Sequence, residues 1–459
     1  MLRVEKPRWV GSERRRMRVR RVLERSRSRE RVGGRVRSQE TPCCAPETVD
    51  SDEYFDTILL QGFHWTSHRH QWYKILKEKA EEIAEAGYTH VWLPPPSHSV
   101  SPEGYLPGHL YELNTKYGSK QELLDAIAAL RKCGIKVVAD IVINHRCAQM
   151  QDENGEWNTY TDDIDHEGNK VNWGKWAVVE GDFGGTGNKD SGEDFHAAPD
   201  LDHENPELRN ALISWLCFLK GHVGFSGWRF DFVKGYAARF VEEYIVKTVG
   251  NGSFCVGEYW NDSVYDESGL AYNQDAARQQ LCDWIDECNA SSAAFDYTTK
   301  GILQEAVRDQ YWRLKDPKGK ATGLIGWWPD RAVTFIDNHD TGGEQNQWPF
   351  PSEKVVLGYV YVLTHPGIPS VFWSHHFDWD LARDLKKLIA LRRRNGINSN
   401  SKLHITMADP DCYVAEIGES VLVKLGSRFD LGKGFPGAQW RLVTSGKDYA
   451  VWEKEEEAS

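Results

Sequence analysis

The chain has 459 residues, of which 40% are apolar and 19 are tryptophan, and its net charge is −12. This length exceeds one ordinary domain and allows a large core with aromatic surface to spare. The charge is uneven, because an arginine-rich head over residues 1–40 carries +10 and residues 41–459 therefore carry −22. So acidic a body excludes nucleic acid and anionic membrane as partners and is compatible with a neutral polymer or with bound cations.

The head lacks the apolar run of a secretory signal, and the chain has no stretch of about eighteen apolar residues that would span a bilayer. We therefore expect an intracellular protein of the plastid or cytosol that is not secreted. The arginine and serine content is typical of a transit peptide, whereas Glu13, Glu24 and Glu30 favour a disordered leader. RNA binding by the head is a third hypothesis. Nine cysteines without zinc-binding spacing indicate reduced thiols.

From residue 57 onward, short apolar runs alternate with segments of helical periodicity. Strands that are apolar on both faces and separated by helices are typical of a parallel sheet covered by helices, and eight such units fit a β/α barrel. The predicted strands are Thr57–Phe63, Tyr88–Leu93, Ile135–Ile143, Gly224–Phe232, Phe254–Glu258, Ala293–Phe295, Ala332–Ile336 and Ile368–Phe372. The predicted helices are Trp72–Ala86, Gln121–Leu130, Pro206–Lys220, Ala237–Val249, Ala276–Cys288, Lys300–Leu314, Glu353–Leu363 and Leu381–Arg394.

Two regions depart from this alternation. Residues 146–203 are rich in Gly, Asp, Asn and Trp, and a loop of that length inside a compact domain must fold on something else, which we take to be metal. After Lys402 four short strands without helices predict a small antiparallel domain. These strands are Tyr413–Ile417, Val421–Leu425, Trp440–Val443 and Tyr449–Trp452. The expected domains are a leader and linker at 1–55, a barrel at 56–146 and 204–395, an insertion at 147–203 and a β domain at 396–459.

One predicted strand end combines charged and aromatic residues. Arg229 and Asp231 are two residues apart and share one face of the strand, while Phe230 and Phe232 occupy the other, beneath the helix layer. Catalytic groups gather at the carboxyl ends of barrel strands, so Asp231 is a candidate nucleophile. Taken alone, such a pair is more often a structural ion pair.

Two further acids occupy the same position on other predicted strands. Glu258 ends the fifth strand, and Asp340 follows the seventh. Cleavage of a glycosidic bond needs one acid to protonate the leaving oxygen and one carboxylate to meet the oxocarbenium-like carbon. We therefore expect Asp231, Glu258 and Asp340 to meet around a single sugar-sized gap.

Four segments, in this order, resemble the signature regions of the α-amylase family of glycoside hydrolases: Asp140–Arg146, Gly227–Lys234, Gly257–Trp260 and Ile336–Asp340. The resemblance runs from about residue 57 to residue 455. Within the family, Trp327-Trp328-Pro329 and the segment Leu363–Gly367 are most similar to the plant-type α-amylases. The first forty residues have no counterpart in the family.

The resemblance implies a (β/α)8 TIM barrel, a calcium-binding domain B inserted after strand 3 and a C-terminal antiparallel β-sheet domain. It implies that Asp231 forms a covalent glycosyl-enzyme, that Glu258 is acid and then base, and that Asp340 holds substrate hydroxyls and stabilises the transition state. A retaining mechanism places the first two carboxyls about 5–5.5 Å apart. Burial would raise the pKa of Glu258, and Arg229 would keep Asp231 ionised.

The resemblance also implies contacts to the sugar, from the aromatic faces and from neutral histidine donors. The residues concerned are Tyr105, His145, Arg229, Lys234, Trp260 and His339. The alternatives are that the aromatic residues belong to the core and that the histidines fill polar gaps. Trp327 and Trp328 resemble a surface platform for starch granules, although adjacent residues of a strand point opposite ways, so that one of the two belongs to the core.

Calcium is the cofactor that the resemblance implies. Ca²⁺ takes hard oxygen ligands, which the insertion can supply. The implied ligands of one ion are the side chains of Asn144, Asp190 and Asp200 with the carbonyls of Glu193 and Gly235, and those of a second ion are Asp194 and Asp200. Taken alone, the acidic segment Asp190–Asp202 is more often a solvated loop than a metal site.

The sequence thus predicts an endo-acting, retaining α-1,4-glucan hydrolase, an α-amylase, that is calcium-dependent and acts on starch or maltodextrins. We expect a monomer without nucleic-acid or membrane partners. Two alternatives stay open, a glucan transglycosylase of the same fold and a catalytically weak starch-binding protein.

Overall fold

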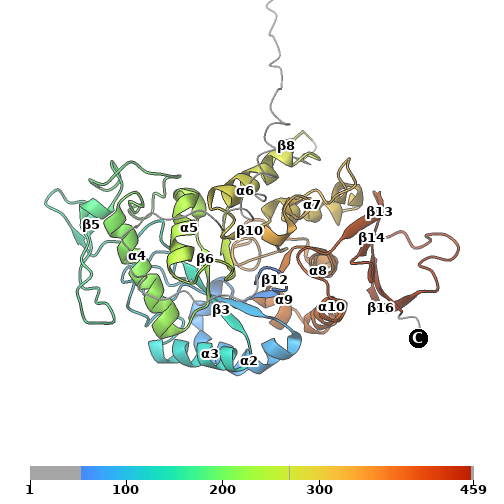
Figure 1. Cartoon of the computed structure of the whole chain (residues 1–459), viewed down its shortest axis with the longest axis horizontal. Helices are drawn as coiled ribbons and strands as arrows, with labels where there is room; N and C mark the ends of the chain where they lie inside the picture. Colours follow the sequence, from blue (N-terminus) through green and yellow to red (C-terminus); the bar gives the residue numbers. More distant parts are fainter. Residues whose placement is uncertain (1–52, 268, 456–459) are drawn as a thin grey trace, which may run out of the picture. The chain divides into compact units, whose positions relative to one another are not determined.

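The computed structural model describes residues 53–267 and 269–455. Eight parallel strands close into a barrel in chain order, and helices surround it (Figure 1). The barrel strands are β1 (Leu59–Gln61), β2 (His90–Leu93), β3 (Lys136–Ile141), β6 (Gly227–Phe230), β7 (Cys255–Gly257), β10 (Ala293–Phe295), β11 (Ala332–Thr334) and β12 (Ile368–Phe372). The (β/α)8 barrel predicted from the sequence is confirmed.

Helices follow the barrel strands along the chain. They are α2 (Trp72–Ala86), α3 (Lys120–Lys132), α4 (Pro206–Phe218), α5 (Ala238–Lys247), α6 (Asp275–Glu287), α7 (Tyr297–Ala306), α8 (Val355–Thr364), α9 (Trp373–Phe377) and α10 (Ala382–Arg394). Short helical turns lie at η1 (Trp65–Arg69), η2 (Lys175–Ala177), η3 (Leu219–Val223), η4 (Val233–Gly235), η5 (Tyr311–Leu314), η6 (Leu324–Gly326), η7 (Pro329–Arg331) and η8 (Ser352–Lys354).

Local sequence explains where several of these helices begin and end. Helix α3 starts with a capping box, in which the Ser119 hydroxyl accepts from the Glu122 amide and the Glu122 carboxylate accepts from the Ser119 amide. Helix α2 ends at Gly87, whose φ of 95° lies in the left-handed region that favours glycine. The predicted helix Lys300–Leu314 is wrong in its second half, because α7 ends at Ala306 and a separate turn, η5, follows.

The expected alternation along the fourth strand fails at its end. Strand β6 stops at Phe230, and Phe232 has a φ of 41°, so its ring leaves the buried face. The Phe232 ring is half-buried and lies 5.8 Å from that of Phe195, in the insertion. Phe230 packs in the core as predicted, but Phe232 does not.

The segment between β3 and α4 contains little regular structure. It has one small hairpin, β4 (Met150–Gln151) with β5 (Trp157–Thr159), and several isolated bridges. A fully buried ion pair joins Arg146 Nη2 to Asp163 Oδ2 at 2.9 Å, and the Asp163 carboxylate also accepts from the backbone amides of Leu110 and Tyr111. Buried polar contacts therefore help to hold this segment to the loop after β2, and Tyr160, Trp173 and Leu201 join the main apolar core.

The last part of the chain is a five-stranded antiparallel sheet, drawn in red in Figure 1. Its order is β13 (Leu403–Asp409), β14 (Cys412–Ile417), β15 (Val421–Leu425), β17 (Tyr449–Lys454) and β16 (Trp440–Gly446). The predicted antiparallel domain is confirmed, and it contains one strand more than predicted, β13, in which Leu403, Ile405 and Met407 alternate with His404 and Thr406. His365 Nε2 lies 2.9 Å from the Tyr413 hydroxyl, which ties the sheet to the end of α8.

The predictions for residues 1–52 lie outside the described residues. Within residues 53–267 and 269–455, none of the helices combines the length and the apolar character needed to cross a bilayer. A two-stranded ribbon, β8 (Tyr265–Asp266) with β9 (Gly269–Leu270), precedes α6. Six of the described cysteines are free thiols, but Cys217 is disulfide-bonded, so the prediction of reduced thiols is wrong at that position.

Candidate active site

The predicted acids Asp231 and Glu258 lie at the carboxyl ends of neighbouring barrel strands. Asp231 follows β6, and its amide donates to Ile141 O at 3.0 Å; Glu258 follows β7, and its amide donates to Phe230 O at 2.9 Å. These backbone bonds extend the parallel ladder by one residue and bring the two side chains to the same end of the barrel.

The buried guanidinium of Arg229 contacts three acids. We call these four residues the Arg229 group: Asp140, Arg229, Asp231 and Glu258. Arg229 Nη1 lies 2.8 Å from Asp140 Oδ1 and 2.5 Å from Asp231 Oδ1. Arg229 Nη2 lies 2.9 Å from Glu258 Oε1, an ion pair without the alignment of a hydrogen bond. Three acids therefore share one cation, which lies beneath them.

Exposure separates the acids of this group. The side chain of Asp140 is 0% exposed, whereas those of Asp231 and Glu258 are both 11% exposed. Asp140 is also enclosed by two donors, since Trp92 Nε1 and the Tyr105 hydroxyl both donate to its Oδ2 at 3.0 Å. The carboxyls of Asp231 and Glu258 are therefore partly accessible, whereas Asp140 is closed off and orients Arg229.

Burial is the main influence on the titration of these acids. It raises the pKa of Asp231 to about 6 and that of Glu258 to about 7, and the charge of Arg229 opposes both shifts. The neighbouring carboxylate of Asp231 raises the pKa of Glu258 further. The acid with the direct hydrogen bond to Arg229 thus ionises first, and the other keeps its proton to higher pH.

Asp340 lies on the loop after β11, beside His339. His339 Nε2 lies 3.3 Å from Asp340 Oδ2, and Gln61 Nε2 lies 2.9 Å from His339 Nδ1. Because the amide nitrogen of Gln61 donates to Nδ1, the proton of the neutral ring resides on Nε2. Burial raises the pKa of Asp340 to about 7, with the charge of Glu258 as a second cause. The side chain of Asp340 is 19% exposed, and its charge also raises the pKa of Asp231, so the third predicted acid interacts with the other two.

The predicted aromatic contacts lie around these acids. The rings of Tyr105 and His339 are nearly parallel, at 5.2 Å and 5°, and Trp65 is parallel to both at 6.1 Å. Trp260 is half-buried and stacks on Tyr297 at 4.9 Å. Aromatic faces are thus available on two sides of the acids, as stacking on a sugar ring requires.

His145 and Lys234 are engaged by protein groups at the edge of the site. His145 Nε2 lies 2.8 Å from Tyr105 O, burial lowers its pKa to about 4, and its ring stacks on Phe195. Lys234 Nζ forms an ion pair of 3.0 Å with Glu193 Oε1, from the insertion. Both residues therefore tie the insertion and the loop of Tyr105 to the barrel.

Two residues of the site were not among the predicted ones. Asp140 pairs in register with Arg229 on the adjacent strand, and Tyr297 begins α7 two residues after β10. Two sequence signals were available for them. Asp140 is an acid on the strand before that of Arg229, and Tyr297 is a polar aromatic residue at the carboxyl end of a strand.

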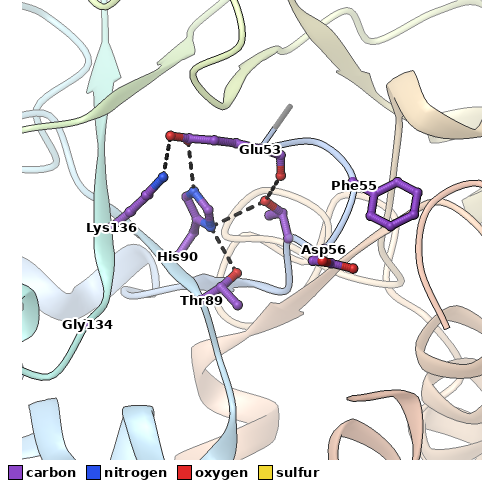
Figure 2. A pocket seen from close by; sticks show the side chains of 8 residues that line it. Glu53, Phe55, Asp56, Thr89, His90, Gly134 and Lys136 are labelled. Atoms are coloured by element: carbon purple, nitrogen blue, oxygen red, sulfur yellow. Dashed lines mark hydrogen bonds and ion pairs between the residues drawn. The ribbon is translucent and has the colours of Figure 1, made fainter. Parts of the chain in front are cut away.

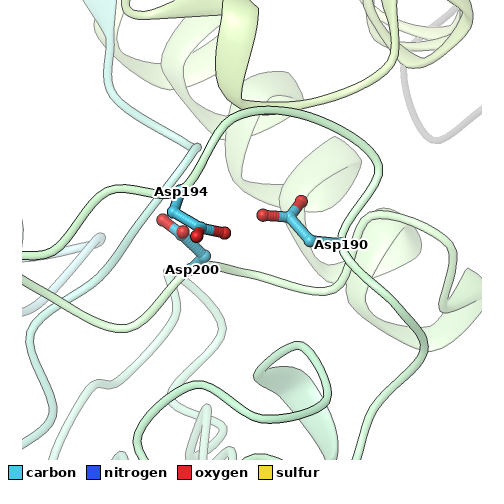
Figure 3. Close-up of side chains that lie close together, drawn as sticks. All are labelled: Asp190, Asp194 and Asp200. Carbon is cyan, nitrogen blue, oxygen red and sulfur yellow. The ribbon is translucent and has the colours of Figure 1, made fainter.

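A second group of acids lies in the insertion, and we call it the aspartate group: Asp190, Asp194 and Asp200. One ligand oxygen of each lies within 4.8 Å of the others (Figure 3). Burial raises the pKa of Asp200 to about 7, and the charges of Asp182 and Asp190 raise it further. Asp182 was not predicted; its Oδ2 accepts from the Asp200 amide at 2.8 Å.

The predicted calcium ligands fit a cation in this place. Asn144 Nδ2 donates to Asp200 Oδ1 at 2.8 Å, which leaves Asn144 Oδ1 buried without a protein partner among the described residues. Asp190 Oδ2 is a second buried oxygen without a partner there. Asn144 Oδ1 lies against Gly235, where an added Cβ would be 1.9 Å from it, and the Glu193 amide donates to the residue before that glycine. Buried oxygens without a hydrogen-bond partner, next to carboxylates that form no ion pair with a lysine or arginine among the described residues, are the donor set of a hard cation.

The predicted tryptophan pair divides between surface and core. The side chain of Trp327 is exposed, and the Arg278 guanidinium lies 3.7 Å from its ring centre. Trp328 is half-buried and packs against the core. The two residues do not belong to a strand but join the turns η6 and η7.

A hollow of about 500 Å³ opens at the opposite end of the barrel, beside the starts of β1, β2 and β3 (Figure 2). Glu53 accepts from His90 Nε2, Lys136 Nζ and the Phe254 amide there. Burial alone would raise the pKa of Glu53, but hydrogen bonds from His90 and Lys136 lower it to about 2. The amino end of a β/α barrel serves stability, so we place no chemistry in this hollow.

Comparison with known proteins agrees with the geometry. A closed β/α barrel with functional groups at the carboxyl ends of its strands is the class of β/α-barrel enzymes, and a pair of carboxyl groups there is what glycoside hydrolysis uses. The α-amylase catalytic domain family matches residues 74–248, and the α-amylase C-terminal β-sheet domain family matches residues 394–453. The chain belongs to the α-amylase family and is similar to its plant-type members.

Two relatives from Arabidopsis thaliana are each 46% identical to 86% of this chain. The chain covers 94% of the probable α-amylase 2 and 44% of the chloroplastic α-amylase 3, so it spans less than half the length of the second. An α-amylase structure from Anoxybacillus is similar in fold, with a TM-score of 0.64 at 16% identity over 88% of this chain and 99% of that one.

Proposed function

We propose that this chain is an endo-acting, retaining α-1,4-glucan hydrolase that cleaves starch and maltodextrins. One observation carries the proposal: Asp231 and Glu258, from different strands, contact the same buried guanidinium while their carboxyls remain partly exposed. The names of the Arabidopsis relatives support the same activity.

In this proposal Asp231, ionised beside Arg229, attacks the anomeric carbon while Glu258 gives its proton to the leaving glycosidic oxygen. The leaving chain departs with that proton, and a covalent glycosyl-enzyme remains. Glu258, now ionised, takes a proton from water, whose oxygen displaces Asp231 from the same carbon and restores both acids. Asp340 and the Nε2–H of neutral His339 hold sugar hydroxyls, and Tyr105 and Trp260 offer faces to the rings.

The substitution Asp231→Asn tests this assignment. An amide cannot attack the anomeric carbon, so we expect reducing-end release from soluble starch to fall by at least about a thousandfold. Asp125→Asn, in an exposed ion pair with Lys77 on the helix layer, is a matched change of charge away from both acidic groups and should keep most activity. Retention of most activity by Asp231→Asn would refute the nucleophile.

A transglycosylase of the same fold is the nearest competitor. The two activities differ in whether water or a sugar hydroxyl accepts the glucosyl unit, so product analysis with added maltose separates them. A starch-binding protein without turnover would adsorb granules and release no sugar. The partly exposed and ionisable acids favour turnover.

We further propose that calcium is the cofactor. The aspartate group, Asn144 Oδ1 and the carbonyls of Glu193 and Gly235 would hold it, with a second ion at Asp194 and Asp200. Bound calcium would supply positive charge that fixes the insertion to the barrel, because Gly235 lies four residues beyond Asp231. The predicted domain boundaries, with domain B at 147–203, are retained as part of this proposal.

Cellular location and assembly are proposals of the same kind. The chloroplastic relative supports the plastid over the cytosol, and we expect a monomer that binds starch or maltodextrin and neither nucleic acid nor membrane. Sequencing the amino terminus of the protein from its native cell would show whether residues 1–55 are removed, as import into the plastid requires.

A further inference from the structure

Tyr297 is a fully buried residue whose ring is fixed from two sides. It begins α7, directly after Asp296, whose carboxylate accepts from the Thr299 amide and caps the helix. The Tyr297 ring stacks on Trp260 at 4.9 Å and meets the edge of Phe335 at 5.0 Å. Packing of this kind leaves the hydroxyl one position.

That hydroxyl lies between the proposed acid/base residue and the loop of Asp340. It is 3.3 Å from Glu258 Oε1 and 3.4 Å from Asn338 Nδ2. The amide of Asn338 has a fixed orientation, because its Oδ1 accepts from the backbone amides of Asp340 and Thr341 at 3.0 and 2.9 Å. Asn338 therefore donates to the Tyr297 oxygen.

A tyrosine hydroxyl has a single proton. Because the Tyr297 oxygen already accepts from Asn338, its proton points to Glu258 Oε1. The Phe232 amide also donates to this carboxylate, at 3.2 Å from Oε2, and the neighbouring Asp231 carboxyl shares a hydrogen bond with it. Arg229 adds charge without aligned geometry. Tyr297 is thus the neutral side chain, outside the Arg229 group, whose hydrogen bond orients Glu258.

We propose that Tyr297 is a positioning residue for the acid/base group: its hydroxyl sets the distance between Glu258 and the Asp340 loop and stabilises the ionised Glu258 carboxylate. The inference rests on the proposed function, in which Glu258 is ionised once it has protonated the leaving oxygen. A donor to the ionised form then stabilises the glycosyl-enzyme relative to the starting complex, and it lowers the pH at which the general acid is lost.

The substitution Tyr297→Phe removes the hydroxyl and keeps the ring. Without the donor, the pKa of Glu258 rises, so the alkaline limb of the kcat/KM profile on maltodextrin should move to higher pH by about half to one unit. The turnover number at the optimum should fall about three- to tenfold, because Glu258 loses its fixed orientation. KM should stay within about twofold, since Trp260 keeps its stacking partner.

A control is offered by Tyr88, a buried tyrosine whose hydroxyl lies 2.8 Å from His376 Nδ1, at the start of β2 and away from the acids. Tyr88→Phe removes a comparable buried hydrogen bond, so it should lower the melting temperature without moving the pH limb. An alkaline limb that stays in place in Tyr297→Phe would overturn the inference and leave the hydrolase proposal intact. A wild-type chain that releases no sugar would overturn the hydrolase proposal itself, and this inference with it.

Discussion

The Arg229 group and the aspartate group are both clusters of three carboxylates, and they differ in what neutralises them. In the first, a buried guanidinium contacts every acid at 2.5–2.9 Å. In the second, no lysine or arginine among the described residues forms an ion pair with any of the three aspartates, and two buried oxygens there lack partners.

The two groups therefore differ in the source of positive charge: the Arg229 group contains a cationic side chain, whereas the aspartate group would have to bind an ion from solution. Burying unpaired carboxylates is costly, so a cluster either contains its own cation or takes one up. The Arg229 group is complete in the chain and can hold its acids in a defined order of ionisation. The aspartate group has no lysine or arginine partner among the described residues, so under the calcium proposal it is the part of the protein that should respond to calcium.

Removal of the internal cation should give the largest effect. Arg229→Met leaves three buried acids with mutual repulsion, so Asp231 becomes protonated and cannot attack. We expect kcat/KM to fall by at least about a thousandfold and the free energy of unfolding in urea to fall by about 3–5 kcal/mol. Arg229→Lys keeps the charge but loses the planar fork and should be intermediate in both. Wild-type activity in Arg229→Met would show that the acids of the Arg229 group do not need the guanidinium.

Removal of the external cation should have a smaller effect, on stability before chemistry. Chelation with EDTA should lower the melting temperature by several degrees, because an ion that binds only the folded state stabilises it. Added calcium should restore the melting temperature. Equimolar magnesium should not, since Mg²⁺ requires a tighter octahedral site.

The variant Asp200→Asn is matched to the chelation experiment. It removes one carboxylate from the aspartate group, so chelator should shift its melting temperature less than that of the wild type. Equal chelator shifts in both proteins would place the ion elsewhere. A melt unchanged by EDTA in the wild type would remove the calcium proposal altogether.

The smallest effect is expected from Trp327→Ala, which lies outside both acidic groups. Its ring is exposed beside Arg278, so adsorption to starch granules should weaken by about threefold to tenfold, as measured by depletion from solution. Activity on soluble maltodextrin and the chelator-sensitive melt should remain at wild-type values. Trp328→Phe, at a half-buried position, is the control that should leave adsorption unchanged.

Particular residues show where reasoning from sequence succeeded. Short apolar runs and helical periodicity placed the barrel strands and helices, and the acids at strand ends gave Asp231 and Glu258, because both signals depend on neighbours a few residues apart. The same reasoning misplaced Phe232, since the left-handed backbone after Phe230 has no marker in the side chains. It also missed β13, although Leu403, Ile405 and Met407 alternate there with polar residues.

By itself the sequence determined the barrel, the antiparallel sheet and the acids that reach the mouth of the barrel, because local periodicity and strand ends are properties of short segments. Only the tertiary structure decided how these acids differ: that Asp140 is closed off beneath Arg229, that Tyr297 donates to Glu258, and that Asn144 Oδ1 is left unpaired beside the aspartates. Exposure, hydrogen-bond direction and pKa depend on atoms from distant parts of the chain, so they exist only once the barrel has closed.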